Sequence, residues 1–449
     1  MVKRISLVAL AALLVAAVCV AGPLAAAEDA ALVEMAKEVA GEVEALRGWT
    51  FKTPVAHKFA SQRDVRAYLD REVAEQCPPQ KIARLEAFLR MVGLLPQECP
   101  LKSTMLDLLQ EQVGGYYDLD QGALYLVDRG QPLPPLIQRV MLAHELTHAL
   151  DDQHVDLDAF LEPLLGKSED LDLAAMSVVE GSATALMTRY MAKAALSGRF
   201  DAQELQSYTE REMKRSRKLL DAPRYFTAML GAYVCGMEFL ARGNLMAVLA
   251  GKGTSIGENL LAAAKDPPQS TEQILHPKKY WDEAARDAPV VLDDAAVARL
   301  LEGGRWVVHT DTLGELLTAI LTNPPGVRPS LLGMNTASAW TNRGAAGWGG
   351  DRFYLLAAGP DAETAGRNLK DLRGVWITLW DTPRDRNEFL ETYERGRPGG
   401  DYVLATLGNL GAVVCFGFGE ADASALAKRF GQSPPAMTRG GEAWSPWAL

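Results

Sequence analysis

The sequence is 449 residues long but contains only six histidines and five cysteines. No two cysteines have the C-x-x-C spacing, so a cysteine zinc site and a thioredoxin-like redox motif are both unsupported. The formal net charge is -11 and there is no basic run, which argues against a surface that binds nucleic acid or anionic lipid. Beyond the N-terminal segment no run reaches 18 apolar residues, so no membrane span is expected in the mature chain.

Motifs of two large enzyme groups are also missing. Gly347-Trp348-Gly349-Gly350 is rich in glycine but lacks the Lys-Ser/Thr pair of a phosphate-binding loop, so we expect a turn there. Ser182 lies outside any G-x-S-x-G motif, which argues against a serine hydrolase. Apolar residues make up 48% of the chain and charged residues 23%, which excludes a largely disordered protein. At about 150 residues per domain the length predicts two or three domains.

The first 27 residues have the pattern of a secretory signal peptide. Lys3 and Arg4 precede an apolar run over residues 5–20, which is shorter than the ~20 residues needed to cross a bilayer. Three alanines that end at Ala27 offer a cleavage site. We therefore expect cleavage near Ala27 and export, to the periplasm or the medium, with an uncleaved membrane anchor as the alternative.

The four cysteines that follow the signal peptide fall into two kinds. Cys77 and Cys99 each precede a proline in a polar context, and we predict a disulfide between them because exported proteins favour such bonds. Cys235 and Cys415 lie in apolar surroundings and are expected to be buried thiols.

The pattern of apolar residues predicts an α+β fold. Residues 28–112 are expected to form an N-terminal helical region. Residues 113–325 are expected to form a mainly helical domain with a short sheet, whose strands fall near 114–118 and 123–127. A proline-rich segment then marks the boundary to a small C-terminal α/β domain, 326–449, with the order β-β-α-β-β-α.

The most specific signal is His144-Glu145-Leu146-Thr147-His148, an HExxH motif in a segment with helical character. Positions i and i+4 lie on one face of a helix, so His144 and His148 can direct imidazole nitrogens at one zinc ion. Zinc acidifies a bound water and polarises a carbonyl, and Glu145 is placed to take the proton as a general base. The motif therefore predicts a zinc centre that performs hydrolysis.

A catalytic zinc usually has three protein ligands, so a third side chain is required. Glu180 is the favoured candidate because an ionised carboxylate in the apolar segment 176–184 is costly unless it is paired or bound to metal. Gly181 beside it leaves room for a close approach.

Other residues compete with Glu180 for the third position. His154 follows His144 at the spacing of the HExxHxxGxxH pattern, although Asp151 occupies the place of the glycine, and Asp tolerates a turn there less well. Glu162 and Asp172 are further acidic alternatives.

With these motifs the sequence resembles the zincin metallopeptidases, specifically the gluzincin type, in which a Glu on a later helix is the third ligand. It also resembles a group of exported bacterial proteins of the peptidase-MA-like kind. The matching segments are 114–118, 124–125, 144–154, 179–181, 270–277 and 347–352. The resemblance implies a zinc ion held by His144, His148 and Glu180, with Glu145 as the general base.

The sequence departs from this pattern in the groups that would orient the ligands. Thermolysin-like enzymes have an Asp four residues after the ligand Glu, where this chain has Thr184, and the closer group has an acid two residues after it, where this chain has Ser182. Asp151 and Asp152, three and four residues after His148, are substitutes on spacing grounds, since carboxylates commonly orient ligating imidazoles.

A peptidase also needs a group that stabilises the oxyanion. His276 and Tyr280 are candidates for this role, as are Tyr116 and Tyr117. The strand 123–127 is a candidate for the sheet edge that pairs with an extended peptide substrate.

These patterns together predict an exported zinc metallopeptidase that acts on a peptide or protein substrate. The alternative is a catalytically inactive zincin-like module for binding or assembly in the cell envelope, and a third interpretation is a metal-dependent hydrolase of a non-peptide bond. The intact Glu145 favours the enzyme, because a binding module gains nothing from a base beside the zinc.

Overall fold

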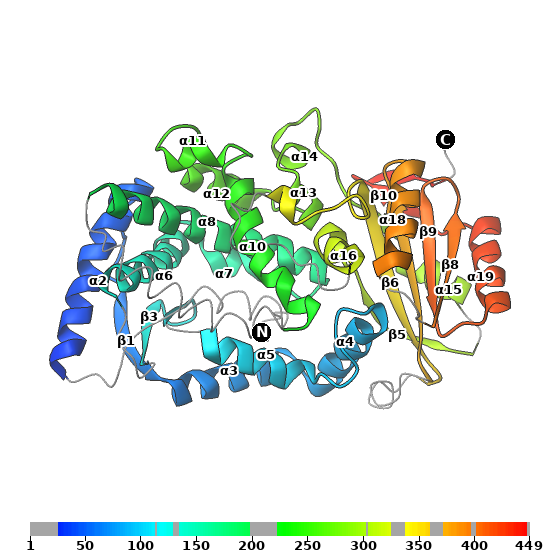
Figure 1. Ribbon diagram of the computed structural model, residues 1–449, viewed down its shortest axis with the longest axis horizontal. Coiled ribbons are helices and arrows are strands. Elements are labelled where there is room, and N and C mark those ends of the chain that lie inside the picture. The colour runs from blue at the N-terminus through cyan, green and yellow to red at the C-terminus, as the bar shows by residue number, and fades with distance from the viewer. Residues whose placement is uncertain are drawn as a thin grey trace.

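The computed structural model describes residues 26–112, 115–128, 134–197, 222–301, 304–324, 337–359, 371–396 and 401–446. Nearly all of the expected signal peptide lies outside these residues, and so does the segment 204–218, for which the sequence predicts a helix. The protein has an α+β fold in which helices occupy most of the elongated molecule and a sheet forms one end (Figure 1). Within the described ranges, no helix combines the length and the apolar character that a bilayer crossing requires.

The N-terminal region is mainly helical, as predicted, but it also contributes a strand that the sequence analysis did not predict. Its elements are α2 (Ala26–Arg47), β1 (Ala56–Ser61), α3 (Gln62–Gln76), α4 (Pro79–Val92) and α5 (Leu101–Gln112). Helix α2 packs against the central helices, whereas α3 to α5 run along another side of the molecule towards the C-terminal sheet (Figure 1).

The predicted pair of strands is present as β2 (Gly115–Asp118) and β3 (Ala123–Asp128), which pair in an antiparallel manner. Strand β1 adds to the other side of β3 in a parallel manner, so the order is β1-β3-β2. The prediction that 123–127 is an edge strand was therefore wrong, because β3 lies in the centre. Strand β2 is the edge that packs against the helix with the HExxH motif.

The centre of the molecule is a set of packed helices. Two long ones, α6 (Pro135–Val155) and α8 (Glu169–Leu196), carry the predicted metal ligands, and α10 (Arg224–Leu240) packs along α8. Shorter helices complete this region: α7 (Leu157–Leu161), α11 (Leu245–Leu249), α12 (Ile256–Lys265), α13 (Thr271–Leu275), α14 (Lys278–Trp281) and α16 (Gly314–Thr322). Helix α15 (Asp294–Leu301) instead packs beside the last helix of the chain, at the C-terminal sheet (Figure 1).

Helices α8 and α10 cross with their backbones in contact. A Cβ atom at Gly181 would lie 2.1 Å from the carbonyl carbon of Gly236, and one at Gly236 would lie 1.8 Å from the carbonyl oxygen of Ser177. The expectation that Gly181 permits a close approach is thus confirmed, and the approaching element is α10.

Replacing Gly236 with alanine is expected to destabilise the fold, because the new methyl group meets the backbone of α8, which cannot move aside as a side chain can. We expect a loss of about 1–3 kcal/mol or more in the free energy of unfolding, measured by urea denaturation. The matched control is Gly41→Ala in α2, where nothing lies within 4 Å, and a gain of about 0.5–1 kcal/mol is expected. Equal effects of the two substitutions would contradict the close crossing.

The C-terminal elements follow the predicted β-β-α-β-β-α order: β6 (Trp348–Ala357), β7 (Arg373–Trp380), α18 (Pro383–Gly396), β8 (Tyr402–Leu407), β9 (Gly411–Phe416) and α19 (Glu420–Gln432). Strand β5 (Trp306–Asp311) joins the same sheet, in the order β5-β6-β7-β9-β8, although it precedes the expected boundary at residue 326. A second small sheet contains β11 (Glu442–Trp444), β10 (Met437–Arg439) and β4 (Val290–Leu292), and η1 (Ala337–Ala339) is a short 3-10 helix.

The predicted disulfide between Cys77 and Cys99 is absent, because both residues are thiols. Cys77 is buried at the end of α3, and burial raises the pKa of its thiol to about 11. The sulfur of Cys99 instead lies 3.2 Å from the hydroxyl oxygen of Thr104. The prediction that Cys235 and Cys415 are buried thiols is confirmed.

Candidate metal centre

The HExxH motif lies in the buried half of α6. From Val140 to Asp151 every residue of this helix is buried, because α2, α8 and strand β2 surround it. His144, Glu145 and His148 are therefore buried as well, and so is Glu180 in the middle of α8. Helical periodicity places the two histidines one turn apart, and the packing of α6 against α8 brings Glu180 opposite them.

Three ligand atoms converge between the two helices. The Nε2 atoms of His144 and His148 lie 3.0 Å apart, and they lie 3.3 Å and 3.5 Å from the same Oε2 atom of Glu180. Among the described residues, neither carboxylate oxygen of Glu180 has a well-directed hydrogen bond, although the side chain is completely buried. A buried carboxylate without hydrogen bonds is costly unless it is paired with a charge or bound to a metal ion.

The donor set and its spacing fit a zinc ion. A tetrahedral ion bound at ~2.0–2.1 Å holds its ligand atoms about 3.3–3.4 Å apart, which is close to the three observed separations. Two imidazoles and one carboxylate also form one of the usual protein ligand sets of a catalytic zinc, which leaves a fourth position open. The residues therefore fit the metal that the sequence predicted.

The charges of these side chains are coupled. Burial alone would lower the pKa of His148, but the carboxylates of Glu180 and Glu145 raise it to about 9. Burial lowers the pKa of His144, and the two imidazoles hold the pKa of Glu180 below its usual value although burial opposes them. Because an imidazole binds a metal ion only in its neutral form, a metal ion at these nitrogens would compete with the protonation of His148.

The carboxylate of Glu145 contacts the edge strand β2. Its Oε2 atom accepts a hydrogen bond of 3.1 Å from the backbone N–H of Tyr117 in β2. A Cβ atom at Gly115 would lie 3.9 Å from the Cγ atom of Glu145, so the same strand passes close to this side chain. Burial raises the pKa of Glu145 to about 8, which increases the affinity of this carboxylate for a proton.

The other candidates for the third ligand lie elsewhere. The Nε2 atom of His154 is 2.9 Å from the carbonyl oxygen of Thr50, and its ring stacks on Trp49. Glu162 is exposed at the end of α7. The structure therefore brings Glu180, and not these two residues, to the histidines.

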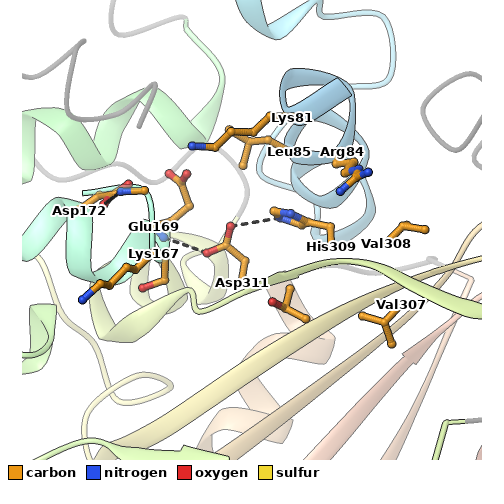
Figure 2. Close-up of a pocket in the computed structure, with 13 residues that line it drawn as sticks. Lys81, Arg84, Leu85, Lys167, Glu169, Asp172, Val307, Val308, His309 and Asp311 are labelled. Carbon is orange, nitrogen blue, oxygen red and sulfur yellow. Dashed lines mark hydrogen bonds and ion pairs between the residues drawn. The ribbon is translucent and has the colours of Figure 1, made fainter. Parts of the chain in front are cut away.

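Asp172 lines a different cavity, of about 390 Å³, between α4, the start of α8 and β5 (Figure 2). Its Oδ1 atom accepts a hydrogen bond from the backbone of Gly166. The acids Glu169 and Asp311 in this cavity are likewise satisfied, by the Tyr225 hydroxyl and by backbone N–H groups. No residue of the metal centre lines this cavity.

The residues proposed to stabilise an oxyanion are used in other contacts. His276 lies 2.9 Å from Glu315 through its Nε2 atom, and the hydroxyl of Tyr280 donates to the carbonyl of Asp266. Tyr116 is buried between the rings of Tyr68 and Tyr125. These three assignments are not supported, because each side chain already serves local packing or hydrogen bonding.

The two acids expected to orient the histidines also have other partners. Asp152 accepts a hydrogen bond from the hydroxyl of Tyr117. Asp151 is paired with Arg47 from α2, whose Nη2 atom lies 2.6 Å from both carboxylate oxygens and from the hydroxyl of Ser182. Among the described residues, the Nδ1 atoms of His144 and His148 therefore have no hydrogen-bond partner.

Two residues near the centre were not identified from the sequence. Arg47 links Asp151, one turn after His148, to Ser182, two residues after Glu180, and so ties the two ligand helices together. Tyr233 of α10 places its ring 6.3 Å from that of His144. Neither lies in a motif, so only the packing of helices distant in sequence reveals them.

Comparisons with known proteins give little information about this centre. Residues 300–409 match a domain family described as a domain of unknown function, DUF8575. This match covers β5 to β8 of the C-terminal sheet and none of the metal-centre residues. No curated protein and no solved structure matches the chain.

Proposed function

We propose that the protein is an exported zinc metallopeptidase. The observation that carries this proposal is the convergence of two imidazoles and one otherwise unsatisfied buried carboxylate, with a second carboxylate, that of Glu145, adjacent to them. Zinc bound by His144, His148 and Glu180 would supply the Lewis acidity that polarises a peptide carbonyl and acidifies water.

The protein itself would then transfer the proton and bind the substrate. Glu145 would take a proton from the attacking water and deliver it to the leaving amine, while the N–H of Tyr117 holds the carboxylate in place. Strand β2 is the sheet edge next to Glu145, and an edge strand can bind an extended peptide by adding it to the sheet. This combination favours a peptide over a compact small molecule as the substrate.

The proposal is tested by incubating zinc-loaded protein with a mixed peptide library and identifying new termini by mass spectrometry. We expect cleavage that disappears when the zinc is removed by a chelator and returns when it is restored. Zinc-loaded, folded protein that cleaves no peptide would contradict the proposal.

That negative result would instead support the second candidate function, an inactive zincin-like module of the cell envelope. The observation that favours this candidate is the lack of hydrogen-bond partners at the Nδ1 atoms of His144 and His148. Catalytic zinc sites usually orient their imidazoles through such partners.

A further inference from the structure

A second cavity, of about 230 Å³, lies on the side of α8 that faces the end of α2 and the start of α12. Its lining includes Arg47 from α2, Arg189 from α8 and Lys252 from the loop that precedes α12. The lining contains no Asp or Glu. Arg47 is paired with Asp151, but Arg189 and Lys252 add two further positive charges and the lining adds no carboxylate, so the cavity has the charge that an anion requires.

The cationic groups are only partly neutralised by the protein. Arg47 uses its Nη2 atom to bind Asp151 and Ser182, but its Nε atom has no hydrogen-bond partner among the described residues, although the side chain is only 2% exposed. Arg189 donates to the carbonyl of Leu46 through Nη1. Burial, with a further contribution from the charge of Arg47, lowers the pKa of Arg189.

The remaining groups of the lining also favour negative charge. Lys252 is exposed at the rim and forms no ion pair with any described residue. Helix α12 begins at Ile256, and the positive end of its dipole borders the cavity. A Cβ atom at Gly251 would lie 3.9 Å from the Nη2 atom of Arg189, so the loop lies next to the guanidinium.

We propose that this cavity is a binding site for a small phosphate-bearing ligand. A phosphate group offers several acceptor oxygens and a double negative charge, which matches two guanidinium groups and an ammonium group better than a single carboxylate does. The volume is below the ~300–1,000 Å³ of pockets for drug-sized ligands, so free phosphate or a short phosphomonoester fits better than a nucleotide. The proposal does not rest on the proposed peptidase activity, although Arg47 also binds Asp151 beside the candidate metal centre.

The proposal is tested by isothermal titration of the purified protein with inorganic phosphate, glycerol 3-phosphate and acetate. We expect one binding site per chain for inorganic phosphate or for glycerol 3-phosphate. The ligand that binds more tightly identifies whether the site takes free phosphate or a phosphomonoester. Acetate should bind more weakly than either. Arg189→Ala and Lys252→Ala should each weaken binding of the phosphate ligand at least about tenfold.

Lys265→Ala provides the matched control, because this lysine is exposed at the far end of α12 and should leave binding unchanged. Lys252 is exposed in a loop, so its substitution keeps the test valid even if Arg189→Ala fails to fold. Absence of saturable binding at millimolar ligand, or binding equally weakened by all three substitutions, would overturn the proposal.

Discussion

Replacing Glu145 with glutamine is expected to lower the rate constant of zinc-dependent peptide hydrolysis about 10²- to 10⁴-fold, the usual contribution of a general base. Glutamine preserves the shape of the side chain and can still accept the hydrogen bond from the N–H of Tyr117, but it cannot take a proton. Because Glu145 is not one of the three side chains whose ligand atoms converge, zinc binding should remain at one ion per chain.

The measurement is the kcat/KM of the zinc-loaded variant for a peptide identified in the library experiment. Glu162→Gln is the matched control, since Glu162 is exposed and outside the centre, and its kcat/KM should equal that of the wild type. A Glu145→Gln variant that binds zinc and has full activity would show that Glu145 is not the general base. The assignment of the metal ligands would be unaffected by that result.

The second large effect is expected at Arg47. Its ion pair with Asp151 is buried, with the two side chains 2% and 1% exposed, and Arg47→Met would leave the carboxylate of Asp151 without its cationic partner. Breaking such a buried pair costs about 3–5 kcal/mol, measured as the change in the free energy of unfolding in urea. Since Arg47 joins the two ligand helices, zinc affinity should decrease as well.

Two variants separate the ion pair from other effects of the substitution. Arg66→Met removes an exposed pair with Asp107 and should cost at most about 1 kcal/mol. The double variant Arg47→Met/Asp151→Leu removes both buried charges and should recover much of the lost stability, because apolar replacements of buried ion pairs are often neutral. If Arg47→Met lowers the free energy of unfolding no more than Arg66→Met does, the ion pair between Arg47 and Asp151 does not hold the two ligand helices together.

The parts of the centre that could be predicted from sequence are those determined by local spacing. The i and i+4 positions of His144 and His148 determine that the rings share a helix face, whatever packs around them. Glu180 could be identified because a carboxylate in an apolar helix requires a partner, and Gly181 because a glycine there permits a backbone contact.

The groups around the ligands could not be predicted, because they depend on contacts between distant segments. Asp151 has suitable spacing to orient His148, but its carboxylate forms an ion pair with Arg47, which lies 104 residues earlier. His154 has nearly the spacing of a third ligand, but Trp49 and the carbonyl of Thr50 hold its ring. Short-range spacing contains no information about these partners.

The same distinction applies to the fold. The alternating and apolar segments of the C-terminal region were sufficient to predict β6 to β9 and their helices in the correct order. Strands β1 and β5 pair with strands further along the chain, and their mixed sequences, AHKFAS and WVVHTD, gave no comparable signal.

The most direct test of the central claim is the zinc content of the purified protein, measured by native mass spectrometry on the wild type and on single-ligand variants. The wild type should bind one zinc ion per chain, His148→Ala and Glu180→Ala should lose it, and His154→Ala should retain it. A wild type that binds no zinc, or a His148→Ala variant that binds it as tightly as the wild type, would contradict the account.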